Sequence, residues 1–145
     1  MRLLRDAGFQ LVLITNQSGI ARGYFDEATV ARIHERLQAM LADEGLVLDA
    51  IFCCPHGPND GCSCRKPAPG MVHAAMCALK FSAAEAVVIG DNPADMGAAA
   101  AAGVAAIRIA PHGGVDGSVL DFLDAARKAI DLLRSDNQVR SAECT

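Results

Sequence analysis

The stretch Cys53–Gly70, CCPHGPNDGCSCRKPAPG, carries the strongest chemical signal in this sequence. Cys54 and His56 form one pair with a single residue between them, and Cys62 and Cys64 form a second pair with the same spacing. Three thiolates and one imidazole make a tetrahedral ligand set of the kind that closes around a structural Zn²⁺. The intervening GPNDG is rich in turn formers, which can bring both pairs to one ion. The stretch therefore predicts a zinc-binding loop.

Two other interpretations of these cysteines stay open: incidental cysteines of a reduced chain, or a disulfide between two of them. Four of the six cysteines fall within residues 53–64 beside a histidine, a clustering that favours a metal site. Cys53 precedes a ligand, so in an extended segment its side chain would point to the opposite face. We therefore predict that Cys53, Cys77 and Cys144 are not ligands.

Two cations follow the last cysteine directly. Arg65 and Lys66 are succeeded by Pro67 and Pro69, which restrict the backbone after them. A metal ion in the loop would therefore fix the position of both cations.

Length and composition limit the class of protein. The 145 residues, 52% of them hydrophobic, predict one domain over residues 1–135 and a disordered polar tail over 136–145. No apolar run approaches the ~20 residues of a membrane span, and the amino terminus has no signal pattern, which predicts a cytoplasmic protein without a membrane partner. The net charge of -4, without a basic run, argues against nucleic acid as a partner.

Apolar runs alternate with amphipathic segments along the chain. We expect strands at residues 10–14, 46–53, 85–89 and 105–109, and helices at 1–8, 26–44, 70–80, 93–102 and 118–134. His34 and His73 fall on two of these helices, and we expect them to be surface or partly satisfied side chains rather than ligands. This alternation predicts an α/β fold with a mostly parallel sheet.

Three polar clusters are expected at the carboxyl ends of the strands, where such sheets bind ligands. The first is Thr15-Asn16-Gln17-Ser18, whose donors can cradle a phosphate. The second is Arg65-Lys66, a planar fork and a point charge for phosphoryl oxygens. The third is Asp91, a hard ligand for Mg²⁺, with Asp95, for which a helix-terminus charge and a catalytic role both stay open. Together they describe a Mg²⁺-assisted phosphoryl-transfer site.

Three segments of the sequence resemble three of the four motifs of haloacid-dehalogenase-superfamily phosphatases. They are ITNQSGIARG, CPH with CSCRKPAPGM, and GDNPADMGAAAAAG. The zinc loop narrows the resemblance to the histidinol-phosphate phosphatase group, and the similarity runs from about Leu3 to Ile109. The resemblance implies a Rossmann-like, three-layer α/β/α fold and hydrolysis of a phosphate monoester.

The resemblance also assigns roles to individual residues. It implies that Thr15 and Asn16 bind and stabilise the transferring phosphoryl group, with Gln17 and Ser18 in the same loop. Lys66 would stabilise phosphoryl charge and Arg65 would recognise the substrate. Asp91 would ligate Mg²⁺ beside Asn92, which contacts metal and substrate, while the ligands of Zn²⁺ would be Cys54, His56, Cys62 and Cys64. The implied substrate is a phosphorylated sugar, with histidinol phosphate as the alternative, and the implied state is a monomer.

One motif of the family has no counterpart in this sequence. Members begin with a strand followed by Asp-x-Asp, in which the first Asp is the nucleophile and a Mg²⁺ ligand and the second is the general acid and base. The sequence contains no Asp-x-Asp. We therefore expect either a phosphatase whose amino-terminal segment is missing here, or a catalytically inactive, zinc-stabilised module that binds a phosphorylated sugar or a protein.

The strand that carries this motif lies in the centre of the family's sheet, between the strands predicted here at 10–14 and 85–89. We expect a sheet that lacks this strand. A chain of that kind should aggregate, pair the two strands directly, or borrow a strand from a partner.

Overall fold

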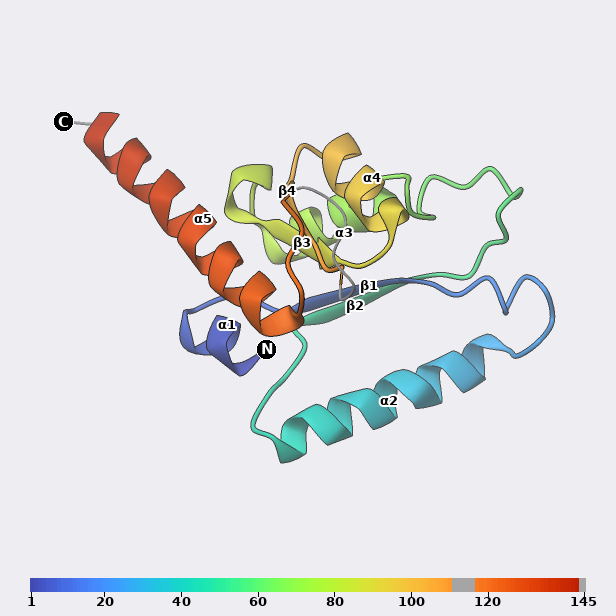
Figure 1. Ribbon diagram of the computed structural model, residues 1–145. Coiled ribbons are helices and arrows are strands. Elements are labelled where there is room, and N and C mark those ends of the chain that lie inside the picture. The colour runs from blue at the N-terminus through green and yellow to red at the C-terminus, as the bar shows by residue number, and fades with distance from the viewer. Residues whose placement is uncertain (111–116, 144–145) are drawn as a thin grey trace.

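The structure is a computed structural model that describes the backbone of residues 1–110 and 117–143 and the side chains of 1–110 and 117–134 (Figure 1). Its helices are α1 (Arg2–Asp6), α2 (Glu27–Asp43), α3 (Gly70–Leu79), α4 (Pro93–Ala101) and α5 (Phe122–Glu143), with a short 3-10 turn η1 (Ala83–Glu85). Its strands are β1 (Val12–Asn16), β2 (Ala50–Cys54), β3 (Val87–Gly90) and β4 (Ala105–Arg108). The predicted alternation of strands and helices is confirmed.

The four strands form two separate parallel pairs. β1 pairs with β2 from Val12 opposite Ala50 onward, and β3 pairs with β4 from Val87 opposite Ala105 onward. Among the described residues no ladder joins β1 to β3. The sheet is thus interrupted where the central strand was expected to be lacking, and the chain does not close the gap by pairing β1 with β3.

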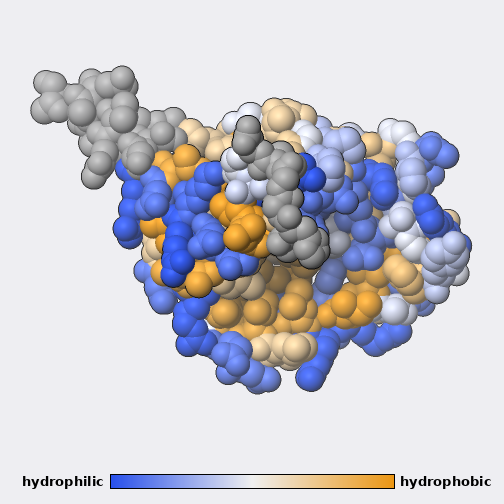
Figure 2. Space-filling view, viewed as in Figure 1, coloured by the Kyte–Doolittle hydropathy of each residue, from blue (hydrophilic) through white to orange (hydrophobic). Residues whose placement is uncertain are grey.

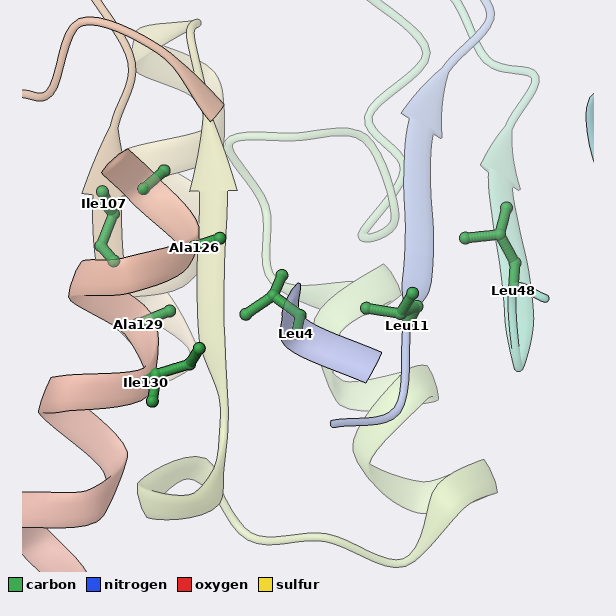
Figure 3. Close-up of a cluster of buried hydrophobic side chains, with 8 residues drawn as sticks. Leu4, Leu11, Leu48, Ile107, Ala126, Ala129 and Ile130 are labelled. Carbon is green, nitrogen blue, oxygen red and sulfur yellow. The ribbon is translucent and has the colours of Figure 1, made fainter. Parts of the chain in front are cut away.

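Helices cover both faces of these strands. On one face, Leu4 of α1 and the start of α5 pack with residues of all four strands (Figure 3). On the other face, Val72 of α3 and Ala98 of α4 pack with Ile14 and Val88. This arrangement is the predicted three-layer α/β/α fold.

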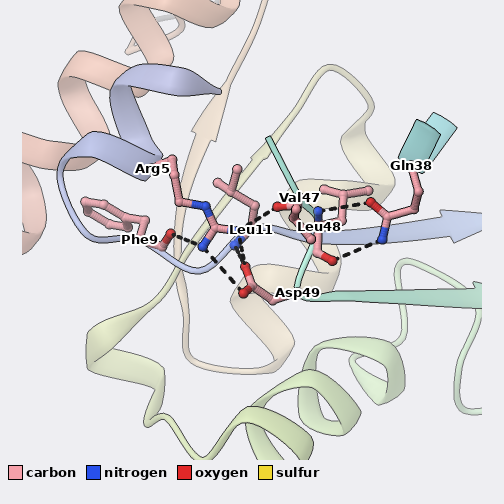
Figure 4. Close-up of polar contacts among 7 residues, drawn as sticks. All are labelled: Arg5, Phe9, Leu11, Gln38, Val47, Leu48 and Asp49. Atoms are coloured by element: carbon pink, nitrogen blue, oxygen red, sulfur yellow. Dashed lines mark hydrogen bonds and ion pairs between the residues drawn. The ribbon is translucent and has the colours of Figure 1, made fainter. Parts of the chain in front are cut away.

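A polar network fixes the start of each strand of the β1–β2 pair (Figure 4). Arg5 of α1 donates to the carboxylate of Asp49 at 3.0 Å, and the same carboxylate accepts the N–H of Leu11 at 2.6 Å. Gln38 of α2 exchanges two hydrogen bonds of 3.1 Å with the backbone of Leu48. The network therefore ties α1 and α2 to the two strand starts.

Several predicted boundaries shift in the structure. Thr15 and Asn16, predicted as loop, end β1, because the β1–β2 ladder runs on until the N–H of Gln17 donates to the carbonyl of Cys54 at 2.8 Å. Glu85, predicted as strand, belongs to η1, where its carboxylate accepts the N–H of Ser82 at 2.9 Å. Local capping outweighs strand propensity there.

The predicted tail is also corrected. The backbone of residues 136–143 continues α5 as a helix, and only the last two tail residues lie outside the described part of the chain. This segment contains neither Gly nor Pro, so nothing in it ends the helix that begins at Phe122. Within the described residues, no helix combines the length and apolar character that a membrane crossing requires.

Apolar side chains gather between the β1–β2 pair and α2 on the face shown in Figure 2. On α2 itself, Ile33 and Met40 are more than half exposed, while Leu37 and Leu41 pack against the core. Asp26 is the N-cap of this helix, since its carboxylate accepts the N–H of Thr29 at 2.8 Å.

Candidate functional site

The zinc-loop residues converge on one point beyond β2. Cys54, the last residue of the strand, is fully buried. Its Sγ lies 3.6 Å from His56 Nδ1, 3.7 Å from Cys62 Sγ and 3.3 Å from Cys64 Sγ. All four ligand atoms lie within 4.8 Å of one another. The fold therefore brings together the four side chains that the spacing singled out.

These separations fit one metal ion. A Zn–S bond of about 2.3 Å gives a regular tetrahedron of sulfurs with edges of about 3.8 Å, and the shorter Zn–N bond brings the imidazole edges to about 3.5 Å. Four of the six distances between donor atoms are 3.2–3.7 Å, close to those edges and much longer than a disulfide bond, and all six are within 4.8 Å. The geometry fits a tetrahedral metal and excludes a disulfide between Cys54 and either Cys62 or Cys64.

The pKa values of two thiols in the cluster are shifted in opposite directions. Burial and the neighbouring Cys54 and Cys62 thiols raise the pKa of Cys64 to about 12. The pKa of Cys62 is lowered: burial opposes the shift, but hydrogen bonds from the Arg65 backbone and the neighbouring thiols outweigh it. The lowered pKa of Cys62 favours the thiolate form, which is the form that binds a metal ion.

The other cysteines and histidines lie outside the cluster. Burial raises the pKa of Cys53, which is half-buried in β2, and Cys77 is exposed on α3. His34 is half-buried and His73 is exposed, as expected of residues on helix surfaces. Cys144 lies outside the described residues.

The loop after the cluster is held by its own backbone and by Arg65. The guanidinium of Arg65 donates to the carbonyl of His56 at 3.1 Å. At the start of α3, the N–H of Gly70 donates to the carbonyl of Ser63 at 3.0 Å. A Cβ at Gly70 would collide with that carbonyl, so glycine is required for the close approach. The metal loop and the first turn of α3 therefore form one unit.

Lys66 lies at the centre of the site. Its ammonium donates to the carbonyl of Ile14 in β1 at 2.9 Å and pairs with the carboxylate of Asp95 in α4 at 2.6 Å. Both side chains are largely buried, at 14% and 9% exposed. Lys66 thus connects the carboxyl end of β1 with the first turn of α4, across the interrupted sheet.

The side chain of Asn16 holds the backbone of Lys66. Its Nδ2 donates to the Lys66 carbonyl and its Oδ1 accepts the Lys66 N–H, both at 3.0 Å. Asn16 therefore positions Lys66, and its amide is engaged before any ligand arrives.

Asp95 takes the helix-terminus role that the sequence left open, and it also pairs with Lys66. One carboxylate oxygen accepts the N–H of Asn92 at 3.1 Å and so caps α4, while the other pairs with Lys66. A Cβ on Gly90 would collide with this carboxylate, so the glycine that ends β3 leaves room for it. Asp95 is therefore a buried structural partner of Lys66.

The remaining predicted residues lie at the same ends of the strands. Asp91 and Asn92 are exposed directly after β3, and among the described residues Asp91 has no ion pair. The side-chain oxygen of Asn92 accepts the N–H of Ala94 at 2.9 Å. The hydroxyl of Thr15 accepts the Gln17 amide at 3.1 Å, and Ser18 is half-buried beyond them. An exposed carboxylate, a hydroxyl and an anchored ammonium can together bind a metal–phosphate group.

Comparison with known proteins shows one consistent similarity. The sequence model of haloacid dehalogenase-like hydrolases matches residues 1–103. The D-glycero-beta-D-manno-heptose-1,7-bisphosphate 7-phosphatase of Bordetella bronchiseptica is 50% identical over 102 residues, 70% of this chain and 57% of that protein. The enzyme of the same name from Pseudomonas putida is 38% identical over 137 residues, 90% of this chain and 78% of that protein.

A solved structure agrees with the sequence relatives. The crystal structure of D,D-heptose 1,7-bisphosphate phosphatase from B. bronchiseptica, in complex with magnesium and phosphate, superposes with a TM-score of 0.78 at 40% identity. The match covers 88% of this chain and 78% of that one.

Proposed function

Because this chain belongs to the haloacid dehalogenase-like hydrolases, we propose that it carries the phosphoryl-binding part of a Mg²⁺-dependent sugar phosphatase. The observation that carries the proposal is the burial of Lys66 between Ile14 of β1 and Asp95 of α4. These contacts hold the Lys66 ammonium at the carboxyl ends of the strands, where phosphate binds in such sheets.

The substrate we propose is D-glycero-β-D-manno-heptose 1,7-bisphosphate, from which the 7-phosphate is removed. The names of the relatives from B. bronchiseptica and P. putida support this substrate. Histidinol phosphate is the alternative, because the zinc loop resembles that group as well. We further propose a cytoplasmic monomer, since a reducing compartment keeps cysteine ligands available for metal.

Each residue of the site has a separate role in this proposal. The Lys66 ammonium stabilises charge on the phosphoryl oxygens, and the Thr15 hydroxyl donates to one of them. Arg65, beside the metal loop, recognises the substrate. Asp91 and Asn92 would hold Mg²⁺, which neutralises phosphate charge when bound. Cys54, His56, Cys62 and Cys64 would hold a structural Zn²⁺ that fixes the loop carrying Arg65 and Lys66.

The covalent step has no nucleophile in this sequence, because no Asp-x-Asp is present. The same observation favours a second function, in which the chain binds the phosphorylated sugar without hydrolysing it. Binding and turnover therefore have to be measured separately.

The test is calorimetric titration of the zinc-loaded chain with the heptose bisphosphate, with histidinol phosphate and with inorganic phosphate, in the presence and absence of Mg²⁺. We expect Mg²⁺-dependent binding that favours the heptose bisphosphate at least tenfold and is lost in Lys66→Ala. Lys80→Ala, which removes an exposed lysine at the end of α3, is the matched control. Equal affinity for the two organic phosphates would contradict the proposed substrate. Binding that survives in Lys66→Ala would contradict the proposed phosphate site.

Release of phosphate from the heptose bisphosphate, measured on the same samples, separates the two functions. Turnover that scales with protein and disappears in Asp91→Ala would exclude the binding-only function. Binding without turnover would support it.

A further inference from the structure

Arg108 is a cation that the candidate site has not used, although it lies at the same edge of the sheet. It is the last residue of β4 and stands opposite Gly90, the last residue of β3. Its side chain is half-buried, and its Nε is the single buried side-chain nitrogen or oxygen without a hydrogen-bond partner among the described residues. Within the same residues its guanidinium forms no ion pair. The described part of the chain therefore leaves this charge without a partner.

The register of β3 with β4 shows which face of the sheet Arg108 occupies. Side chains of paired residues in neighbouring strands point to the same face, and successive residues of one strand alternate. A Cβ on Gly90 would collide with Asp95 of α4, so the partner of Gly90 also points to the α4 face. Ile107, the residue before Arg108, packs with α5 on the opposite face (Figure 3). Arg108 therefore shares a face of the sheet with the Lys66–Asp95 pair.

The carboxylates beside Arg108 do not neutralise it. Both oxygens of Asp95 are engaged, one with the Lys66 ammonium and the other with the N–H of Asn92. Asp91 follows Gly90 and is exposed, and among the described residues it forms no ion pair with Arg108. The first turn of α4 lies over the end of β3, so the positive end of its helix dipole adds to the same field. This end of the β3–β4 pair is therefore electropositive on the α4 face.

The chemistry of a guanidinium specifies the kind of ligand that would compensate this charge. A half-buried cation has lost part of its hydration, which is unfavourable unless an anion or a hydrogen-bond acceptor replaces the water. The planar fork of a guanidinium matches two oxygens of one oxyanion. Since Nε of Arg108 is buried, its two Nη groups are the donors that a ligand can reach. The ligand that fits is an oxyanion bound by these two groups at the carboxyl end of β4.

This position is separate from the one at Lys66. The Lys66 ammonium reaches Asp95 from the β1 side, because it also donates to the carbonyl of Ile14. Arg108 lies on the other side, one strand spacing of about 4.8 Å beyond Gly90. The Asp95 carboxylate stands between the two cations, so one oxyanion would have to displace it to contact both. Two phosphate groups can instead occupy the two positions at once.

We propose that Arg108 forms a second phosphate-binding position, at the carboxyl end of β4 and separate from that of Lys66. The ligand is a phosphate dianion, which two sources can supply. One is the 1-phosphate of a sugar bisphosphate whose 7-phosphate is bound at Lys66, and this source rests on the proposed function. The other is free inorganic phosphate, which does not depend on the proposed function.

The first test follows the Nε–H resonance of Arg108 by NMR in the zinc-loaded chain with Mg²⁺. The resonance is assigned by its loss in Arg108→Gln. We expect the heptose bisphosphate to shift it, and the same sugar with the 7-phosphate alone to leave it in place. A shift with inorganic phosphate that persists in Lys66→Ala would identify free phosphate as a ligand of this position. The position is wrong if neither the bisphosphate nor inorganic phosphate shifts the resonance, or if the 7-phosphate shifts it as far as the bisphosphate does.

The second test measures affinity by calorimetry. Arg108→Gln should weaken binding of the heptose bisphosphate at least tenfold and change binding of the heptose 7-phosphate less than twofold. Arg108→Lys keeps the charge but loses the planar fork, so it should recover part of the affinity. Arg36→Gln, the same substitution at an exposed position of α2, is the matched control and should change neither affinity. An equal loss for both sugar phosphates in Arg108→Gln would place Arg108 at the same phosphate as Lys66 and overturn the second position.

Failure of the proposed function has a different result from failure of this position. If the sugar phosphates do not bind but inorganic phosphate still shifts the Arg108 resonance in Lys66→Ala, the proposed substrate is wrong and the position at Arg108 stands. If the bisphosphate binds through Lys66, Arg108→Gln binds it as the parent does, and inorganic phosphate leaves the resonance unchanged, the proposed function stands and the second position is wrong. Equal zinc content and equal thermal unfolding of Arg108→Gln and the parent show that both comparisons use folded protein.

Discussion

Substituting Asp95 with Asn tests the buried ion pair on which the site depends. The substitution keeps an oxygen that can accept the N–H of Asn92, so the cap of α4 is retained, but it leaves the Lys66 ammonium without its counter-charge. Removing one partner of a buried pair costs about 3–5 kcal/mol, because the remaining charge stays desolvated. In a chain of 145 residues, this corresponds to a fall in Tm of about 10 °C or more.

The control is the ion pair of Asp124 with Arg127 on α5. These side chains are 46% and 62% exposed, against 9% and 14% for Asp95 and Lys66. Asp124→Asn should therefore cost at most about 1 kcal/mol. Both variants are compared with the parent by urea unfolding of the zinc-loaded chain.

A third variant separates charge from packing. Adding Lys66→Met to Asp95→Asn removes the unpaired charge and should recover part of the lost stability. If Asp95→Asn and Asp124→Asn lower the free energy of unfolding equally, or if the double substitution recovers no stability, the Lys66–Asp95 pair does not stabilise the site as a buried ion pair.

Three further predictions rest on single contacts. Cys62→Ser should reduce bound zinc from about one ion per chain to almost none, measured by atomic emission after purification without chelator; full retention would show that the four residues do not form the site. Asn16→Ala removes two hydrogen bonds to the Lys66 backbone and should cost about 2 kcal/mol in urea unfolding, while weakening phosphate binding; unchanged affinity would contradict a positioning role. The Thr29 hydrogen bond lowers the pKa of Asp26, so its stabilising contribution is complete above the usual carboxyl pKa and disappears as pH falls through the lowered value. Unfolding measured between pH 5 and pH 2 should show the loss in the parent and not in Asp26→Ala.

The features that sequence predicted well are local. The four side chains of the candidate metal cluster are confined to residues 54–64, and the turn formers between the two pairs leave few ways to arrange them. The alternation of apolar and amphipathic segments fixed the fold class, because a strand and a helix bury side chains with different periods. The interrupted sheet could be predicted from the family resemblance, and the separate β1–β2 and β3–β4 pairs confirm it.

The features that sequence did not predict are contacts between distant segments. Asn16 and Lys66 are separated by fifty positions, and nothing in either motif indicates that the amide of one holds the backbone of the other. The ion pair of Lys66 with Asp95 likewise depends on how α4 lies over the end of β1. The extension of α5 over residues 136–143 was missed for a different reason: its composition is polar, and polar composition alone does not distinguish a helix from a disordered tail.

The most direct test of the central claim is a crystal structure of the chain grown with Zn²⁺, Mg²⁺ and phosphate. We predict zinc among Cys54, His56, Cys62 and Cys64, and phosphate within hydrogen-bond distance of the Lys66 ammonium. Phosphate bound away from Lys66, with the Lys66–Asp95 pair intact and its ammonium turned from the ligand, would contradict the account.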